Sequence, residues 1–150
     1  MKKKKNNWLN DKFVPSLLFG NPVYDYLLEK SAPSEILFSP EDFWGGNAKI
    51  GKEIVEGNII FFGESFTFKD YIWEQNNASK FWNEELHSFS WLKDVRSLGT
   101  NKARIFVRKN ILEWIKSFGK WNINSWKTDV LAKRIVNLLS HFSFYFNTAN

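Results

Sequence analysis

The sequence of 150 residues contains no cysteine and two histidines, His87 and His141, that are far apart. The absence of cysteine excludes disulfide bonds and thiolate metal sites, and two separated histidines form no common zinc site without carboxylates. The sequence also lacks a glycine-rich phosphate loop and a nucleophile elbow. We therefore expect no metal and no cofactor.

Long apolar runs are also missing. No run approaches the roughly 20 residues that a membrane-spanning helix needs. The apolar segment near the N-terminus is interrupted by Asn10, Asp11, Lys12 and Pro15, which makes it a poor signal peptide. The location stays open, with the cytoplasm as the default and the periplasm as the alternative.

The excess of positive charge is small. The net charge is +5, and the run Lys2–Lys5 supplies nearly all of it. A terminal lysine run is usually a solvated tail. The basic character therefore does not by itself indicate a nucleic-acid partner, and we do not expect one.

Aromatic residues, by contrast, are abundant. The chain has eight Trp and fifteen Phe, and 43% of its residues are hydrophobic. Such a composition excludes a disordered chain, because these side chains need an apolar core or a ligand surface.

The first half of the chain divides into two segments. Residues 1–35 indicate a weakly ordered lead-in with one short helix at Val23–Lys30, since prolines interrupt the rest. Residues 36–78 indicate an irregular segment with a short helix within Asn47–Gly57 and a β-hairpin near residues 59–68, turning at Gly63-Glu64. An isolated hairpin is marginally stable in water, so we expect it to pack on the helices that follow.

Residues 79–150 indicate a helical part. The spacing predicts one helix over Lys80–Leu98 that ends at Gly99. Two apolar stripes would lie on opposite sides of this helix, so both sides must be covered. One stripe contains Trp82, Leu86 and Phe89, and the other contains Trp91, Val95 and Leu98.

Two further helices follow. The second is capped by Thr100 or Asn101 and exposes lysines at seven-residue intervals (Lys102, Lys109, Lys116). Its predicted inward face is Ala103, Val107, Ile111, Trp114 and Phe118, widened by Ile105, Leu112 and Ile115. The third starts near Ser125–Thr128 and is expected to turn Leu131, Ile135, Leu138 and Leu139 inward. Short connections favour antiparallel hairpins, and three helices bury too little surface, so the mainly α fold predicts the beginning of a larger array.

Three segments resemble the heparinase II/III-like proteins of bacteria. They are "LHSFSWLKDVRSLG" (Leu86–Gly99), "ARIFVRKNILEWI" (Ala103–Ile115) and "WKTDVLAKRIVNLLSH" (Trp126–His141). The resemblance implies an incomplete N-terminal α/α toroid and, in a full-length relative, a polysaccharide lyase that cleaves uronic-acid glycans by β-elimination. It places the catalytic residues beyond residue 150, so no catalytic residue is assigned here. Asn137 departs from the pattern, in which an aromatic residue is common at that position.

Four residues are candidates for substrate binding: Trp126, Asp129, Arg134 and His87. As a functional set, Trp126 would stack on a sugar ring at the toroid rim. As a structural set, Asp129 would favour a helix N-terminus and pair with a cation, and His87 would form a buried hydrogen bond.

Two interpretations of function remain open at this stage. In the first, the chain is the non-catalytic N-terminal part of such a lyase, with an acidic polysaccharide as partner together with the missing toroid and β-sandwich. In the second, it is a free-standing helical module that binds an acidic polymer or a partner helix.

Overall fold

The computed structural model describes residues 21–40, 42–73 and 77–146. The predicted lead-in therefore lies largely outside the described residues. The elements in order are α2 (Pro22–Ser31), α3 (Ala48–Val55), β1 (Asn58–Phe61), β2 (Glu64–Thr67), α4 (Lys80–His87), α5 (Leu92–Arg96), α6 (Asn101–Phe118), α7 (Thr128–Ser140) and α8 (Phe142–Phe146). The prediction of a mainly helical chain with one small hairpin is confirmed, whereas the structure does not show an α/α toroid.

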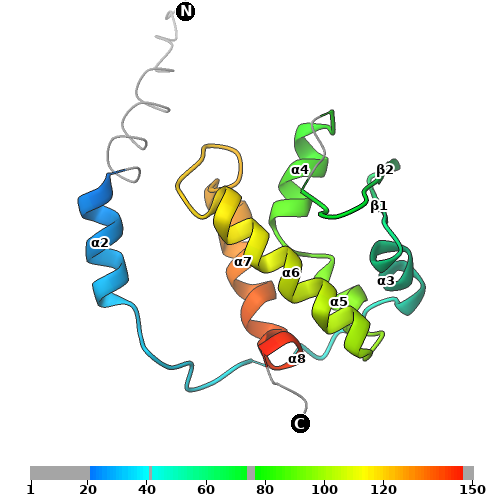
Figure 1. The fold of residues 1–150 in the computed structure, drawn as a ribbon, viewed down its shortest axis with the longest axis horizontal. Helices are drawn as coiled ribbons and strands as arrows, with labels where there is room; N and C mark the ends of the chain where they lie inside the picture. The colour runs from blue at the N-terminus through cyan, green and yellow to red at the C-terminus, as the bar shows by residue number, and fades with distance from the viewer. Residues whose placement is uncertain (1–20, 41, 74–76, 147–150) are drawn as a thin grey trace, which may run out of the picture.

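Helix α2 lies outside the core, at the end of an extended segment (Figure 1). Its N-terminus is capped by Asn21, whose side chain accepts a hydrogen bond from the Val23 N–H. None of its residues is buried. The predicted short helix at Val23–Lys30 is confirmed, but α2 adds no residue to the core.

The hairpin of β1 and β2 turns one residue earlier than predicted. The strands pair antiparallel with Ile59 opposite Phe66 and Phe61 opposite Glu64, so that Phe62 and Gly63 form the turn. Both have positive φ, 53° and 81°. A two-residue turn of this kind needs positive φ at both central positions, which glycine adopts at little cost and phenylalanine does not. The predicted turn at Gly63-Glu64 is therefore wrong.

The hairpin packs on the helices, as predicted. Ile59 is fully buried. The Phe61 and Phe66 rings lie 5.3 and 4.8 Å from the Trp82 ring of α4, and Phe68 lies 6.1 Å from Phe106 of α6. The Trp82 indole N–H also donates to the Glu64 carbonyl at 3.1 Å. These contacts give the hairpin the apolar support that it lacks alone.

Helix α3 lies unusually close to α5. A Cβ at Gly51 would stand 2.1 Å from the Asp94 carbonyl oxygen, and one at Gly46 would stand 2.0 Å from that of Lys93. The Asn47 N–H donates to the Asp94 carboxylate at 2.7 Å and fixes the start of α3. Glycine is required at both contacts because no side chain fits there.

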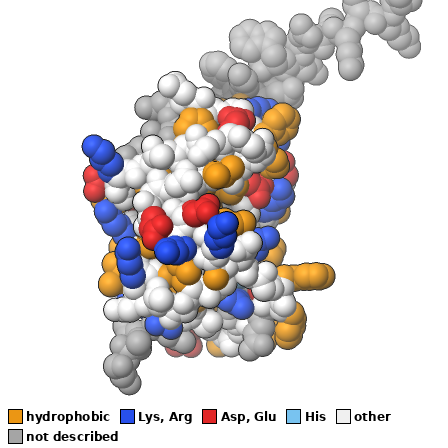
Figure 2. All heavy atoms as spheres, turned by 90° about the vertical axis from the view of Figure 1, so that its right-hand side faces the viewer, with side chains coloured by type: hydrophobic (Ala, Val, Ile, Leu, Met, Phe, Trp, Pro, Cys, Tyr) orange, Lys and Arg blue, Asp and Glu red, His pale blue; other side chains and the backbone are white. Residues whose placement is uncertain are grey.

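Figure 2 shows the face on the side of α3 and the hairpin. Basic and acidic side chains are interspersed there with small apolar groups. One exposed pair on α3 joins Lys52 and Glu56 at 3.8 Å, one helical turn apart. A mixed surface of this kind is typical of a solvated face.

The predicted single helix over Lys80–Leu98 is wrong. Helix α4 ends at His87, and α5 begins at Leu92. Between them Phe89 has a φ of 61° and is fully buried, while the Ser88 hydroxyl donates to the Glu85 carbonyl at 2.7 Å. Such a bond competes with the helical pattern. The break turns the chain so that both predicted stripes reach the core from two helices.

Helix α6 begins and ends as expected but exposes part of its predicted inner face. Gly99 has a φ of 62°, and the Thr100 hydroxyl accepts a bond from the Ala103 N–H at 3.2 Å. The three lysines are exposed, as predicted. Ile105, Leu112 and Ile115, however, are 56%, 66% and 57% exposed, so their predicted inward placement is wrong. The residues around Trp114 already fill the core side, which leaves these three outside.

Helix α7 turns polar residues inward. Val130 and Arg134 are its buried residues, Asn137 is half-buried, and His141 at its C-terminal end is buried. Leu131, Leu138 and Leu139 are half-buried, whereas Ile135 is exposed and its predicted inward placement is wrong. The reason is chemical, because Arg134 and Asn137 meet the backbone carbonyls of His87 and Ser88 at the end of α4.

Candidate functional site

The break between α4 and α5 leaves backbone carbonyls that have no helical partner. Arg134 Nη1 donates to the His87 carbonyl at 3.3 Å and to the Ser125 carbonyl at 2.7 Å. Asn137 Nδ2 donates to the Ser88 carbonyl at 2.9 Å. Because a buried unpaired carbonyl is costly, α7 supplies the donors that the interrupted helix needs.

The Arg134 guanidinium packs against two indole rings that also contact each other. Its central carbon is 4.3 Å from the centre of the Trp114 ring and 5.1 Å from that of Trp126. Among the described residues, no carboxylate lies within ion-pair distance of it. Burial lowers the pKa of Arg134 to about 10, which still leaves it charged at neutral pH. Carbonyl dipoles and aromatic faces therefore stabilise this charge.

His87 is held in one protonation state. Its Nδ1 accepts a hydrogen bond from the Trp114 indole N–H at 3.0 Å. Burial, together with the charge of Arg134, lowers the pKa of His87 to about 4. The ring is thus neutral at pH 7 and carries its proton on Nε2. It stacks on Trp73 at 5.5 Å and meets the edge of Phe118 at 4.7 Å.

A polar cavity of about 500 Å³ opens beside His87. We call it the His87 cavity. Among the residues that the structure describes, the charged ones in its lining are Lys80 and Glu84, which lie 3.8 Å apart; Glu84 also pairs with Lys127 at 3.1 Å. The lining residues come from α4, from the segment before it and from the end of α6 with the loop after it: Ala78, Lys80, Asn83, Glu84, His87, Phe118, Asn122 and Asn124.

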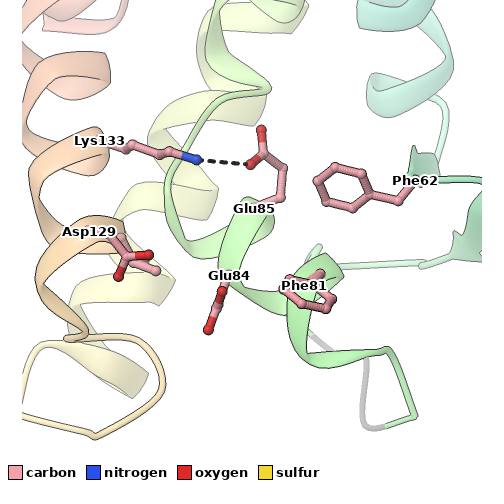
Figure 3. Close-up of a pocket in the computed structure, with 7 residues that line it drawn as sticks. Phe62, Phe81, Glu84, Glu85, Asp129 and Lys133 are labelled. Atoms are coloured by element: carbon pink, nitrogen blue, oxygen red, sulfur yellow. Dashed lines mark ion pairs between the residues drawn. The ribbon is translucent and has the colours of Figure 1, made fainter.

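A smaller crevice of about 80 Å³ lies between α4 and α7 (Figure 3). Lys133 of α7 pairs with Glu85 of α4 at 3.7 Å, while Glu84 points away from Glu85. Two adjacent residues on a helix do not face the same group. These two carboxylates each bind lysines and do not form an acid–base pair.

Three of the four predicted site residues come together. His87, Trp126 and Arg134 form one cluster with Trp114, in which Trp126 is half-buried and its indole N–H donates to the Phe118 carbonyl at 2.7 Å. Asp129 does not join them. It is exposed, and its hydrogen bond with Lys127 at 3.1 Å lowers its pKa. A substrate-binding role for the four residues stays a prediction.

Sequence reasoning missed Asn137 and Ser125 as members of this cluster. A signal was present, since Arg134, Asn137 and His141 follow one another at spacings of three and four residues, which places them on one helix face. The spacing of Asn137 marks it as part of a polar inner face.

The described residues show the structural class of the protein but no enzymatic activity. In the part of the chain that the structure covers, no three metal-ligating side chains gather. No helix described here combines the length and the apolar character needed to cross a bilayer. The structure is a small, mainly helical unit built around an aromatic core and a buried arginine cluster.

Comparison with known proteins gives one relative. The chain is 42% identical over 122 residues to FtsZ-localized protein C of Caulobacter vibrioides, which is 80% of this chain and 21% of that protein. The chain thus spans about a fifth of the length of the relative that it matches. No protein-family model matches the chain, and no solved structure does.

This similarity corrects the resemblance drawn from the sequence. The heparinase II/III-like assignment and the polysaccharide-lyase function are contradicted, because the similarity found is to an FtsZ-localized protein, whose name points to FtsZ and not to a polysaccharide. The residues that carried the resemblance have packing roles here. His87, Trp114, Trp126 and Arg134 contact one another, and Arg134 also donates to the His87 carbonyl at the helix break.

Proposed function

We propose that this chain is a helical protein-interaction module that acts where FtsZ is localised. The observation that carries the proposal is the 42% identity to FtsZ-localized protein C over four-fifths of this chain. The name of that relative says that it localises with FtsZ. The proposal transfers this setting to the present chain and assigns it no catalysis.

The outward face of α6 supports a role in binding. Ile105, Leu112 and Ile115 are exposed on one side of α6 at spacings of seven and three residues, and Lys109 and Lys116 lie on the same side. Exposed apolar residues bordered by charges are typical of interaction sites. We call these three residues with the two lysines the α6 face.

A localisation experiment tests the proposal. A fluorescent fusion of the chain is expected to overlap with FtsZ in dividing cells and to disperse when FtsZ is depleted. A fusion that stays diffuse while FtsZ forms its normal structures would contradict the proposal.

The contribution of the α6 face is tested by substitution. The double substitution Leu112→Ser and Ile115→Ser is expected to weaken the overlap of the fusion with FtsZ, since it removes two apolar side chains from the α6 face. The matched control is Ile60→Ser, which removes a similarly exposed isoleucine from β1 of the hairpin. Equal effects of the two changes would remove the α6 face from the proposal.

We also propose the finer architecture, in which the helical part begins an α/α toroid. The exposure of Ile135 and Val136 on α7 and of the α6 face supports it, because further helices would cover these residues. We keep as part of this proposal the division into a lead-in (1–35), a segment with the hairpin (36–78) and a helical part (79–150). A structure of the full-length relative in which the matching faces stay in solvent would refute the toroid.

A further inference from the structure

We propose that the His87 cavity binds a carboxylate group, with the Nε2–H of His87 as the donor at its floor and the Lys80 ammonium at its rim. The inference does not depend on the proposed localisation. It rests on the state of His87, on the charges around the cavity and on the rigidity of its walls.

The first step concerns the donor. Because Trp114 donates to Nδ1 at 3.0 Å, the neutral His87 ring has its N–H at Nε2. The ring lines the cavity and is otherwise enclosed by Trp73, Trp114 and Phe118. A fixed donor at the edge of an aromatic enclosure favours a ligand that accepts a hydrogen bond.

The second step concerns charge. Arg134 contacts the His87 carbonyl and has no carboxylate partner among the described residues. Among the described lining residues, Lys80 and Glu84 are charged, and Glu84 is also held by Lys127, which it shares with Asp129. Lys80 has no second carboxylate partner among the described residues, so its ammonium can pair with a ligand carboxylate. A singly charged carboxylate is repelled less by Glu84 than a doubly charged phosphate would be.

The third step concerns the walls. The side-chain amide of Asn83 donates to the Ala78 and Ser79 carbonyls, at 3.0 and 3.1 Å. The Asn122 side chain accepts the Asn124 N–H at 2.9 Å. Groups that are already hydrogen-bonded within the fold need no rearrangement when a ligand enters, which favours binding. A volume of about 500 Å³ accommodates a small carboxylic acid or the side chain of a Glu or Asp.

The test is a titration of the folded protein followed by NMR of the His87 ring nitrogens and the Asn83 side-chain amide. The probes are acetate and a blocked Gly-Gly-Glu-Gly-Gly peptide. Sodium chloride at equal ionic strength and the same peptide with Gln in place of Glu are the references. We expect saturable shifts with both carboxylates, with dissociation constants in the millimolar range that suits so few contacts. Saturation by acetate alone would assign the site to a free small carboxylate, and saturation by both would assign it to an acidic side chain as well.

The matched variants are Lys80→Gln and Lys52→Gln. Each lysine is exposed and pairs with a glutamate one helical turn on, at 3.8 Å in both cases, so the two substitutions remove the same kind of pair. Lys80→Gln is expected to weaken acetate binding about two- to fivefold, as for an exposed charge pair, and Lys52→Gln to leave it unchanged. Equal affinities in the two variants, equal shifts with chloride, or no saturation in the millimolar range would overturn the proposal.

Discussion

The segment from α4 to α5 forms two interfaces, one aromatic and one polar. On one side it meets the hairpin and α6 through rings, with Trp82 against Phe61 and Phe66, and Phe89 against Trp114 at 5.8 Å. On the other side it meets α7 through hydrogen bonds from Arg134 and Asn137 to backbone carbonyls. The two interfaces share the same short stretch of chain.

The difference shows how a helix can be interrupted inside a core. The aromatic interface gains stability in proportion to the apolar surface that it buries. The polar interface contributes less per bond, but losing one partner leaves a buried group unpaired, which costs more than the bond contributes. The aromatic side therefore provides stability, and the polar side permits the break that lets both apolar stripes face inward.

The largest expected effect lies on the aromatic side. Trp82→Ala removes a fully buried ring that contacts two phenylalanines, so we expect a loss of about 3–5 kcal/mol in the free energy of unfolding. Chemical denaturation measures it. The matched control is Trp44→Ala, which removes an exposed indole and is expected to cost less than about 0.5 kcal/mol. Similar losses at the two positions would contradict the assigned core.

The next effect is a dependence on pH that comes from the polar side. Folding lowers the pKa of His87 from its ordinary 6.5 to about 4, so the unfolded chain takes up the proton first as the pH falls. Stability should decrease between pH 6.5 and 4, by a total on the order of 3 kcal/mol.

Denaturation curves at several pH values test this dependence. His87→Gln, whose amide oxygen can still accept the Trp114 N–H, should flatten the slope. A smaller slope of the same sign should remain, because burial also lowers the pKa of His141. A wild-type stability that is constant from pH 7 to 4 would show that His87 protonates as easily in the folded chain as in the unfolded one.

A smaller loss is expected at a single bond of the polar interface. Asn137→Leu has a similar size but leaves the Ser88 carbonyl without its donor, which should cost about 1–3 kcal/mol. Asn101→Leu, on the exposed first turn of α6, is the control. If Asn137→Leu proves stabilising, the interface tolerates an apolar contact and the carbonyl has another partner.

The smallest expected effect is a gain. Phe62 adopts positive φ in the hairpin turn and is mostly exposed, so Phe62→Asn should relieve backbone strain and raise the free energy of unfolding by about 0.5–1 kcal/mol. Thermal unfolding measures the change. A loss of stability would mean that the Phe62 ring contributes more through the crevice in Figure 3 than the strain costs.

Local rules predicted much of this fold from the sequence. Gly99 and Thr100 mark the boundary before α6, and Asn47 and Gly57 bracket α3, because caps and left-handed glycines act over a few residues. The break at Phe89 escaped prediction for a physical reason. The apolar residues before and after Phe89 both keep helical spacing, so periodicity alone cannot distinguish one long helix from two short ones.

The candidate site was predicted in part. The sequence predicts His87, Trp126 and Arg134 as members of the site. It does not predict Asn137, because the Ser88 carbonyl is available as an acceptor only where the helix is interrupted. The inward turn of Arg134 likewise follows from that carbonyl and from two indole faces supplied by distant segments. The spacing within α7 shows that its polar residues share one face, but it does not show which groups that face meets.

The close approach of α3 to α5 also limits how this sequence can diverge among descendants. A single base change can convert glycine to alanine, yet at Gly51 the new methyl carbon would lie 2.1 Å from a backbone oxygen that has no room to move. At Gly45, no atom lies within 4 Å of the same added carbon. Lineages that retain this fold should therefore keep glycine at position 51 while position 45 drifts.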